Sequence, residues 1–494
     1  MPKVTLDLTH SKGGGGGSVP PPTHQDLYSK RKQIYPKLAH GKFRMVKWVV
    51  MIVALAVYYV LPWLRWDRGE GIANQAVLAD FESEKFYFFW IEIWPQEAYY
   101  LAGLMILASL GLFLVTSVLG RVWCGYACPQ TVWTDLYIWV ERAFEGDRAA
   151  RMRLDKAPLS FNKLWRKLAK HTVWLIIAFW TGGVFVLYWH DAPTVAKGWF
   201  TGEAPLSAYW FAGMLTMTTY FLAGTMREQV CTYMCPWPRI QGALTDEHAL
   251  NVTYRYDRGE PRGPKRKSES WDDRGECIDC NQCVQVCPVG IDIRDGAQLE
   301  CIHCALCIDA CDQMMRKIDR PTGLIAYDTD TAVLARADGK VAPKFKIVRM
   351  RTVLYGTLIA MIGSLMLFGL ATKATFELNV LKDRSPPFVA LSNGDTRNGY
   401  TLKLVNKMSE PREMRVELSG LDNASMKVIG LDEENSGAVI VPVAAYGVDR
   451  YRILLTSPNK DRNQQAIFTV TDIETGEVMV NKVAFKTPKE KAND

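Results

Sequence analysis

One stretch of cysteines, from Cys277 to Cys311, constrains this chain more than any other feature. Its first run reads Cys-x-x-Cys-x-x-Cys-x-x-x-Cys-Pro, and a second run repeats the same cysteine spacing. Thiolates at this spacing bind [4Fe-4S] clusters. The sequence therefore predicts two [4Fe-4S] clusters, whose ligands are Cys277, Cys280, Cys283, Cys287, Cys301, Cys304, Cys307 and Cys311.

The spacing also predicts how the ligands are shared. Three cysteines separated by two residues each can surround one cubane, whereas the fourth projects away and in bacterial two-cluster ferredoxins ligates the other cluster. We therefore assign one cluster to Cys277, Cys280, Cys283 and Cys311, and the other to Cys301, Cys304, Cys307 and Cys287. Asp312 follows the second run where Pro288 follows the first, which alters a turn but not the ligands.

Zinc and disulfides are the alternatives for these cysteines. Paired Cys-x-x-Cys units also build zinc sites. Zinc needs four ligands per ion, however, and this requirement does not explain a third cysteine at the same interval. Disulfides require an oxidising compartment, and this segment is expected in the cytoplasm. Iron–sulfur binding is therefore the interpretation that the spacing favours.

Long apolar blocks separated by charged ones make up much of the 494-residue chain, of which 48% is hydrophobic. Stretches of about twenty apolar residues can cross a bilayer. The expected spans are 45–64, 99–119, 172–188, 208–225 and 352–371. The formal charge of +7 fits basic loops at a membrane face, and we find no nucleic-acid-binding or P-loop signature.

Lysine and arginine gather in the N-terminal arm and in the loops after the second and fourth spans. By the positive-inside rule, the N-terminus and both clusters face the cytoplasm and the C-terminus lies outside. The arm contains a Gly13–Gly17 run, prolines and many lysines, so we expect disorder. It has no short apolar core with a small-residue cleavage site, so we do not expect a secretory signal. The expected location is a bacterial inner membrane, crossed several times.

The last part of the chain changes to short alternating strands, at 400–405, 414–418, 438–443 and 466–471, with a hairpin expected at Thr475-Gly476. Such strands predict an immunoglobulin-like β-sandwich without a disulfide. The fold class is a multidomain membrane protein: an α-helical transmembrane bundle, an inserted bacterial-type 2[4Fe-4S] ferredoxin domain and this sandwich. The domains are a disordered cytoplasmic arm (1–43), a four-helix membrane region (44–254), the cytoplasmic ferredoxin domain with basic linkers (255–351), a fifth membrane helix (352–372) and a periplasmic immunoglobulin-like domain (373–494).

A second cysteine system consists of two Cys-x-x-x-Cys-Pro motifs, Cys124 with Cys128 and Cys231 with Cys235. On a helix this spacing would place both thiols on one face, and both motifs end an even-numbered span, so the four thiols are expected to converge. Cysteine also serves as a small apolar residue in membrane helices, but the duplication favours a function. Thiolates suit Cu(I), zinc or iron–sulfur, as a metal site or a redox relay.

Several other side chains are weaker candidates. His190 could bind a metal or a quinone, and His303 could tune a cluster rather than ligate it. Glu92 and Glu97 flank the aromatic stretch 86–94, which suits a membrane interface, and we expect both to be solvated or snorkelling. Four methionines near the fourth span could offer thioethers to Cu(I), although ordinary packing also explains them: Met214, Met217, Met226 and Met234.

The chain resembles the cytochrome c oxidase accessory proteins of the FixG/CcoG/RdxA type. The resemblance covers most of the chain, through the segments 28–36, 65–69, 86–97 and 123–135, both ferredoxin runs and the tail. The Cys-x-x-x-Cys-Pro pairs are also similar to those of quinol-oxidising membrane ferredoxins of the NapH type, whereas the tail and the upstream segments are not.

The resemblance implies a membrane protein that assists copper-centre assembly in cbb3-type oxidases by reducing Cu(II) to Cu(I), a cupric reductase. It implies that the eight ferredoxin cysteines ligate clusters and that Cys124, Cys128, Cys231 and Cys235 handle copper. The implied partners are a copper transporter or chaperone, oxidase subunits and an electron donor, in a monomer or a homodimer. Two alternatives stay open: a quinol-oxidising electron conduit, and an assembly scaffold without enzymatic activity.

Overall fold

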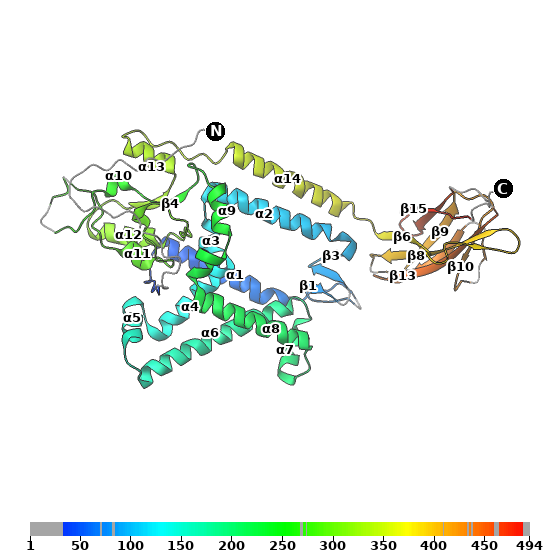
Figure 1. Ribbon diagram of the computed structural model, residues 1–494, viewed down its shortest axis with the longest axis horizontal. Helices are drawn as coiled ribbons and strands as arrows, with labels where there is room; N and C mark the ends of the chain where they lie inside the picture. The colour runs from blue at the N-terminus through cyan, green and yellow to red at the C-terminus, as the bar shows by residue number, and fades with distance from the viewer. Residues whose placement is uncertain are drawn as a thin grey trace, which may run out of the picture. The chain divides into compact units, whose positions relative to one another are not determined.

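The computed structural model describes residues 33–69, 72–81, 84–266, 270–272, 274–408, 410–431, 434–435, 438–458 and 464–487. The chain forms two compact units: Met1–Trp63 with Gly111–Tyr355, and Leu64–Leu110 with Gly356–Asp494. Helices α2 (Tyr99–Leu119) and α14 (Met350–Ala371) each contribute to both units (Figure 1). The predicted arm lies outside the described residues as far as residue 32.

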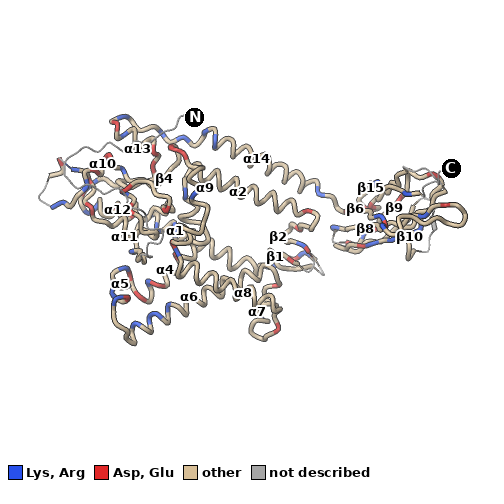
Figure 2. Tube along the Cα trace, in the orientation of Figure 1, with Lys and Arg blue, Asp and Glu red and all other residues tan. Residues whose placement is uncertain are grey.

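Within the described residues, four helical segments are long and apolar enough to cross a membrane: Lys42–Trp63, Pro95–Leu119, Phe161–Leu187 and Met350–Ala371. They contain α1 (Lys42–Val60), α2, α6 (Phe161–Leu187) and α14. Figure 2 shows almost no charged residues along the middle of α2 and α14. Four of the five expected spans therefore fall on such helices, although α6 begins eleven residues before the expected start, within the basic segment.

The remaining expected span, 208–225, is divided between two helix types. Helix α8 (Leu206–Thr219) continues as a π-helix over Tyr220–Met226. Helix α8 packs against α6 in backbone contact, because a Cβ added at Gly182 would lie 2.8 Å from the Ala212 carbonyl oxygen. Glycine is therefore the residue that lets these two helices approach.

The other helices and strands of the first unit surround the cysteines. The ferredoxin segment is closed by an antiparallel pair, β4 (Asn251–Tyr254) and β5 (Ile325–Asp328), which joins its two ends. Val252, Ile308 and Met315 are buried in the core beneath this pair. The helices are α3 (Val122–Tyr126), α4 (Pro129–Glu145), α5 (Arg148–Lys156), α7 (Ala192–Thr201), α9 (Trp237–Leu244), α10 (Tyr256–Gly259), α11 (Gln282–Val286), α12 (Leu306–Lys317) and α13 (Asp330–Ala337).

Residues 33–41, at the end of the expected arm, run between α5 and α11. The Tyr35 hydroxyl donates a hydrogen bond to Asp155 at 2.7 Å, and Arg151 donates to the Pro36 carbonyl oxygen at 2.7 Å. The Lys37 backbone N–H donates to the Gln285 carbonyl oxygen at 2.8 Å. This segment therefore connects the basic loop after the second span to the ferredoxin segment.

The second unit contains a small sheet that the sequence analysis did not predict. Strands β1 (Val77–Asp80), β2 (Lys85–Phe88) and β3 (Ile91–Ile93) pair in that order, so the aromatic stretch is largely strand. Glu97 is buried, with its carboxylate 2.8 Å from Lys373 Nζ and 2.6 Å from Lys407 Nζ. The expectation that Glu97 is solvated was wrong, because two lysines distant in sequence neutralise it.

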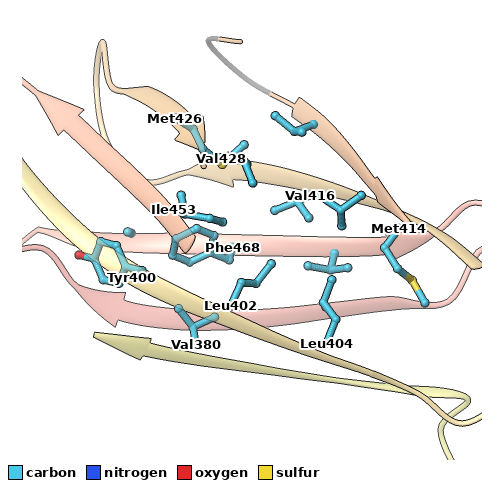
Figure 3. Packing of buried hydrophobic residues seen from close by; sticks show 14 of the residues in the cluster. Val380, Tyr400, Leu402, Leu404, Met414, Val416, Met426, Val428, Ile453 and Phe468 are labelled. Atoms are coloured by element: carbon cyan, nitrogen blue, oxygen red, sulfur yellow. The ribbon is translucent and has the colours of Figure 1, made fainter. Parts of the chain in front are cut away.

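The C-terminal residues form two antiparallel sheets around one core. Phe468 and Val416 of one sheet meet Tyr400, Leu402 and Ile453 of the other, all buried (Figure 3). The four expected strands fall on β8 (Thr396–Asn406), β9 (Arg412–Ser419), β12 (Ala438–Val443) and β14 (Gln465–Asp472), and the expected hairpin joins β14 to β15 (Val478–Ala484). The strand orders are β11-β10-β13-β8-β6, with β7 beside β8, and β12-β9-β14-β15. The bounds of the other strands are Phe376–Lys382 (β6), Val389–Ala390 (β7), Ser425–Val428 (β10), Glu434–Asn435 (β11) and Val448–Ser457 (β13).

Candidate redox site

The two ferredoxin runs adopt the same backbone course. Asp279 and His303 occupy equivalent positions and have φ angles of 55° and 53°, and Asn281 and Ala305 have φ angles of 56° and 58°. In each run a helix begins at the next residue, α11 after Asn281 and α12 after Ala305. Left-handed residues turn the chain sharply. The duplicated sequence is therefore also a duplicated fold, as a two-cluster binding domain requires.

The structure brings Cys311 to the first run rather than to its own. Burial raises the pKa of the Cys311 thiol, and the neighbouring Cys283, Cys280 and Cys277 raise it further. These four cysteines are the set that the sequence assigns to one cluster. Cys311 reaches the first run because it lies on α12, which packs against α11.

The second set meets at a small cavity. Cys287, Cys301, Cys304 and Cys307 line it together with Cys283, and the rest of the wall is largely aliphatic. Burial raises the pKa of Cys287 to about 11, and the nearby Cys304 raises it too, whereas hydrogen bonds from three following backbone N–H groups lower it. Such N–H groups stabilise sulfur ligands of a cluster.

These residues fit iron–sulfur clusters better than a zinc ion. Within the described residues, no three His, Cys, Asp or Glu side chains are grouped as they would be around a single metal ion. The thiolates of a cubane bind four different irons, so they stand farther apart than the ligands of one ion. The crossed sets of cysteines agree with this requirement, because their members are neighbours without forming such a group.

The sequence analysis expected both thiols of each Cys-x-x-x-Cys-Pro motif to lie on one face of a helix. That expectation was wrong. Helix α3 ends at Tyr126, Cys128 precedes α4, and Pro129 is the first residue of α4. Cys235 follows the π-helix Val230–Met234 and is likewise extended, with ψ of 123° against 129° for Cys128. A proline disfavours helical geometry in the preceding residue. Each motif therefore straddles a break between two helical segments.

Despite these breaks, the four thiols approach one another within one chain. Burial raises the pKa of Cys124 to about 12, and Cys128, Cys231 and Cys235 raise it further, whereas Arg121 opposes the shift. Burial raises the pKa of Cys231 to about 11, with further contributions from Cys128, Cys235 and Glu228, whereas Lys47 opposes the shift. Cys235 is the exposed member of the group. Thiols with such values are protonated at neutral pH, so metal binding would release protons.

The first thiol pair lies directly against the second cluster loop. A Cβ added at Gly125 would lie 2.7 Å from the Ile302 carbonyl oxygen and 2.9 Å from the Cys304 Cα. The Tyr126 hydroxyl donates a hydrogen bond to the Cys304 carbonyl oxygen at 3.2 Å. Cys124 packs against the group of buried apolar side chains that contains Ile302 and Cys304. Only glycine at position 125 allows this approach.

Arg121 fixes the same loop from the end of α2. Its backbone N–H donates to His303 Nδ1 at 3.1 Å, and its guanidinium donates to the carbonyl oxygens of Cys301, at 3.2 Å, and of Leu299. A further bond of 2.7 Å reaches the Pro238 carbonyl oxygen, beyond the second thiol pair. Burial lowers the pKa of His303 to about 3, so its ring is neutral and holds its proton on Nε2.

A buried group of charges positions the second thiol pair, and the sequence analysis missed it. Glu141 on α4 binds Arg227 at 2.8 Å and Arg151 at 2.6 Å, with Lys170 at 3.6 Å. Burial raises the pKa of Glu141, but these cations outweigh it and bring the pKa to about 2. Arg227 ends the π-helix that precedes Cys231. The carboxylate and its three cations are separated by up to 86 residues, so the sequence contains no local pattern that would reveal the group.

Helix α1 connects the ferredoxin segment to α4. Asp309 on α12 accepts hydrogen bonds from the backbone N–H of Arg44, at 2.7 Å, and of Phe43, at 3.3 Å, and its charge suits a helix N-terminus. The Arg44 side chain binds Asp135 of α4 at 2.8 Å. The ferredoxin segment and the thiol motifs are therefore held together by contacts within the first unit.

The weaker candidates are less closely associated with this site. His190 lies in the turn between α6 and α7, and Met214 and Met217 are exposed on α8. Met234 is exposed beside Cys235. His303 lies within the second ferredoxin run and accepts a hydrogen bond from the backbone N–H of Arg121, three residues before Cys124.

Comparisons with known proteins agree with this architecture. A family model described as "4Fe-4S dicluster domain" matches residues 226–330, and one described as "4Fe-4S binding domain" matches residues 101–145. All twelve cysteines lie within these two segments. The model of the "IG-like fold at C-terminal of FixG" matches residues 366–488.

Curated relatives match nearly the whole chain. "Nitrogen fixation protein FixG" of Rhizobium meliloti is 48% identical over 87% of this chain and 88% of its own. The chain belongs to the FixG/RdxA family. "Protein RdxA" of Cereibacter sphaeroides is 46% identical over 93% of this FixG/RdxA-family chain and 98% of its own, and "Protein RdxB" of the same organism is 48% identical over 85% and 87%. Family membership and the four apolar helices identify a membrane protein with 4Fe-4S-binding domains.

Proposed function

We propose that this protein is a membrane-bound iron–sulfur reductase that converts Cu(II) to Cu(I) at its four paired thiols. We further propose that the Cu(I) is used to assemble the copper centre of a cbb3-type cytochrome oxidase. Membership of the FixG/RdxA family and the two 4Fe-4S-binding segments support a redox role. The reacting thiols would be Cys124, Cys128, Cys231 and Cys235.

The contact between Gly125 and the Cys304 loop carries this proposal. Electron transfer needs short distances, and the backbone atoms of a predicted cluster ligand lie against the segment that contains Cys124. The iron–sulfur clusters supply one-electron chemistry when bound. Arg121 and Tyr126 hold the two segments in register through the carbonyl oxygens of Cys301 and Cys304.

Copper chemistry suits the thiols as the place of reduction. Each Cu(II) ion gains one electron and becomes Cu(I), which prefers soft sulfur ligands. The four thiols are near one another but are not grouped as the ligands of one ion, so a copper ion would bind to some of them at a time. Exposed Cys235 provides the access that a passing ion needs.

The expected orientation completes the proposal. The N-terminus and the ferredoxin segment would face the cytoplasm, and the C-terminal domain would face the periplasm. A copper transporter or chaperone would exchange copper with the thiols, and oxidase subunits would receive it. The exposed apolar helices, α14 among them, would lie in lipid.

The test is anaerobic. The purified full-length protein is reduced, excess reductant is removed, Cu(II) is added, and a Cu(I) chelator and the iron–sulfur absorbance are followed together. We expect Cu(I) in proportion to the electrons stored, and much slower formation in a variant with all four thiols changed to serine. The variant must retain the iron content of the parent, because the ferredoxin cysteines are untouched.

The alternatives predict different results. If the reduced parent does not react with Cu(II), the copper proposal fails and the electron-conduit alternative becomes the one to test. If the serine variant makes Cu(I) as fast as the parent, copper is reduced elsewhere and the thiols have another role. A scaffold would tolerate disruption of the clusters as long as the C-terminal domain stayed folded.

A further inference from the structure

A cleft beside the second cluster loop is not used by the proposed copper chemistry. It is lined by residues of β4, α13, the end of α9 and the loop 293–303, and it extends to the cluster ligand Cys301 and to His303. Its empty volume, open mouth included, is about 1560 Å³. The thiol motif contacts this loop through Gly125, which does not line the cleft. The cleft therefore offers a second approach to the same predicted cluster.

The walls of the cleft suit a planar ring. Tyr254, Tyr256, Val333, Leu299 and Leu334 provide aromatic and aliphatic surface. Leu299 and Leu334 are 57% and 55% exposed, so both are available to a ligand. Pockets for small organic ligands have this composition, with a few polar groups that orient the ligand.

The charged groups of the cleft argue against a phosphate-bearing ligand. The Arg121 guanidinium is bound by the carbonyl oxygens of Leu299, Cys301 and Pro238. The Arg294 guanidinium is bound by Asp292 and by Asp279 and Asn281 of the first ferredoxin run. Both cations are therefore engaged, and among the described residues that line the cleft a nucleotide would find no free cation.

Two features of the lining suit a ligand that carries hydroxyl groups. Asn251 Oδ1 is buried and accepts no hydrogen bond from the described residues. Gly120 packs against this oxygen, because a Cβ there would lie 2.5 Å from it, and Asn251 itself lines the cleft. Glu247 and Asp330 line the cleft as two carboxylates that can accept protons.

We propose that this cleft binds the ring of a hydroquinone, the electron donor of the protein. The ring would lose two electrons and two protons and become a quinone, with the protons passing to Glu247, Asp330 and water. The two predicted [4Fe-4S] clusters match this donor because each accepts one electron. A nicotinamide donor does not fit, because it gives up a hydride and the cleft offers no group that accepts one. The choice of ligand rests on the proposed electron-transfer function, but not on copper.

The position of the cleft agrees with a membrane donor. Arg121 lies two residues after the apolar segment Pro95–Leu119, and Gly242 and Thr245 belong to the segment that follows the second thiol motif. A hydroquinone with an apolar tail would therefore reach the cleft from the end of a candidate span.

The test measures binding rather than turnover. The full-length protein with its iron–sulfur content intact is dialysed to equilibrium against duroquinone, with empty detergent micelles as the blank and riboflavin as a second ligand. We expect saturable duroquinone binding that Leu299→Trp and Leu334→Trp abolish, because each fills the cleft from one side. Asn251→Ala should raise the Kd about threefold to tenfold, the effect of losing one hydrogen bond.

Leu159→Trp is the matched control, because Leu159 is 89% exposed and lies outside the cleft. It should bind duroquinone like the parent, and all variants should keep the parent's iron content. The proposal is overturned if the parent shows no saturable binding, if both tryptophan variants bind normally, or if riboflavin binds and duroquinone does not. Copper reduction by chemically reduced protein bypasses this cleft, so the two proposals can fail independently.

Discussion

At the residue scale, Glu141 contributes more to the geometry of the site than its position in the sequence suggests. It is buried on α4 and binds Arg227, which ends the helix before Cys231, as well as Arg151 and Lys170. Removing this buried carboxylate leaves Arg227 and Arg151 without their ion-pair partner, whereas Lys170 also binds Glu145 at 2.8 Å. Breaking a buried ion pair typically costs about 3–5 kcal/mol. Glu141→Gln should therefore destabilise the protein and disturb the second thiol pair.

The pH dependence of this effect follows from the pKa of Glu141. Its pKa is about 2 in the folded protein against an ordinary value of 4.5, so its stabilisation is fully present above pH 4.5 and is lost as the pH falls towards 2. Thermal unfolding of parent and Glu141→Gln should differ most at neutral pH, and the gap should narrow below pH 4.5. A gap that stays constant between pH 7 and pH 3 would contradict this role for Glu141.

At the element scale, α12 determines which of the ferredoxin cysteines lie together. It places Cys311 beside Cys277, Cys280 and Cys283, while Cys307 at its start lines the cavity with the other set. Serine is a poor replacement for a thiolate, so Cys311→Ser should lower the iron content from about eight to about four atoms per chain.

Double variants distinguish the crossed arrangement from the uncrossed one. If Cys311 and Cys280 serve the same cluster, changing both to serine should remove no more iron than changing either alone. Changing Cys311 and Cys304 together should remove nearly all of it. The opposite pattern, measured by iron and sulfide analysis, would mean that each run ligates its own cluster.

The same scale shows what sequence reasoning could and could not reach. Spacing of cysteines is local, so it indicated both the runs and their grouping. The effect of Pro129 and Pro236 was also readable, since a proline disfavours helix in the residue before it, yet the helical-face interpretation ignored it. The Arg121–His303 contact joins residues 182 positions apart and gives no signal in one sequence.

At the scale of the whole molecule, both cysteine systems belong to the unit formed by Met1–Trp63 with Gly111–Tyr355. Sequence patterns predicted the apolar segments and most C-terminal strands, because length and alternation are properties of each segment alone. They did not predict the buried pairing of Glu97 with Lys373 and Lys407, which depends on the fold of the second unit. The proposed electron route stays within the first unit.

That route depends on the approach of Gly125 to the Cys304 loop. Gly125→Ala places a Cβ against backbone atoms that no side-chain rotation can move, so the two segments must separate. Gly213→Ala is the matched control, because a Cβ there meets nothing within 4 Å.

The most direct measurement is the rate at which Cu(II) reoxidises the anaerobically reduced, full-length protein in a stopped-flow instrument. We predict that Gly125→Ala reacts more slowly than the parent and Gly213→Ala, with equal iron content and an equal final yield of Cu(I). If Gly125→Ala keeps its clusters and reacts as fast as the parent, electrons do not leave through this contact, and the proposed route is wrong.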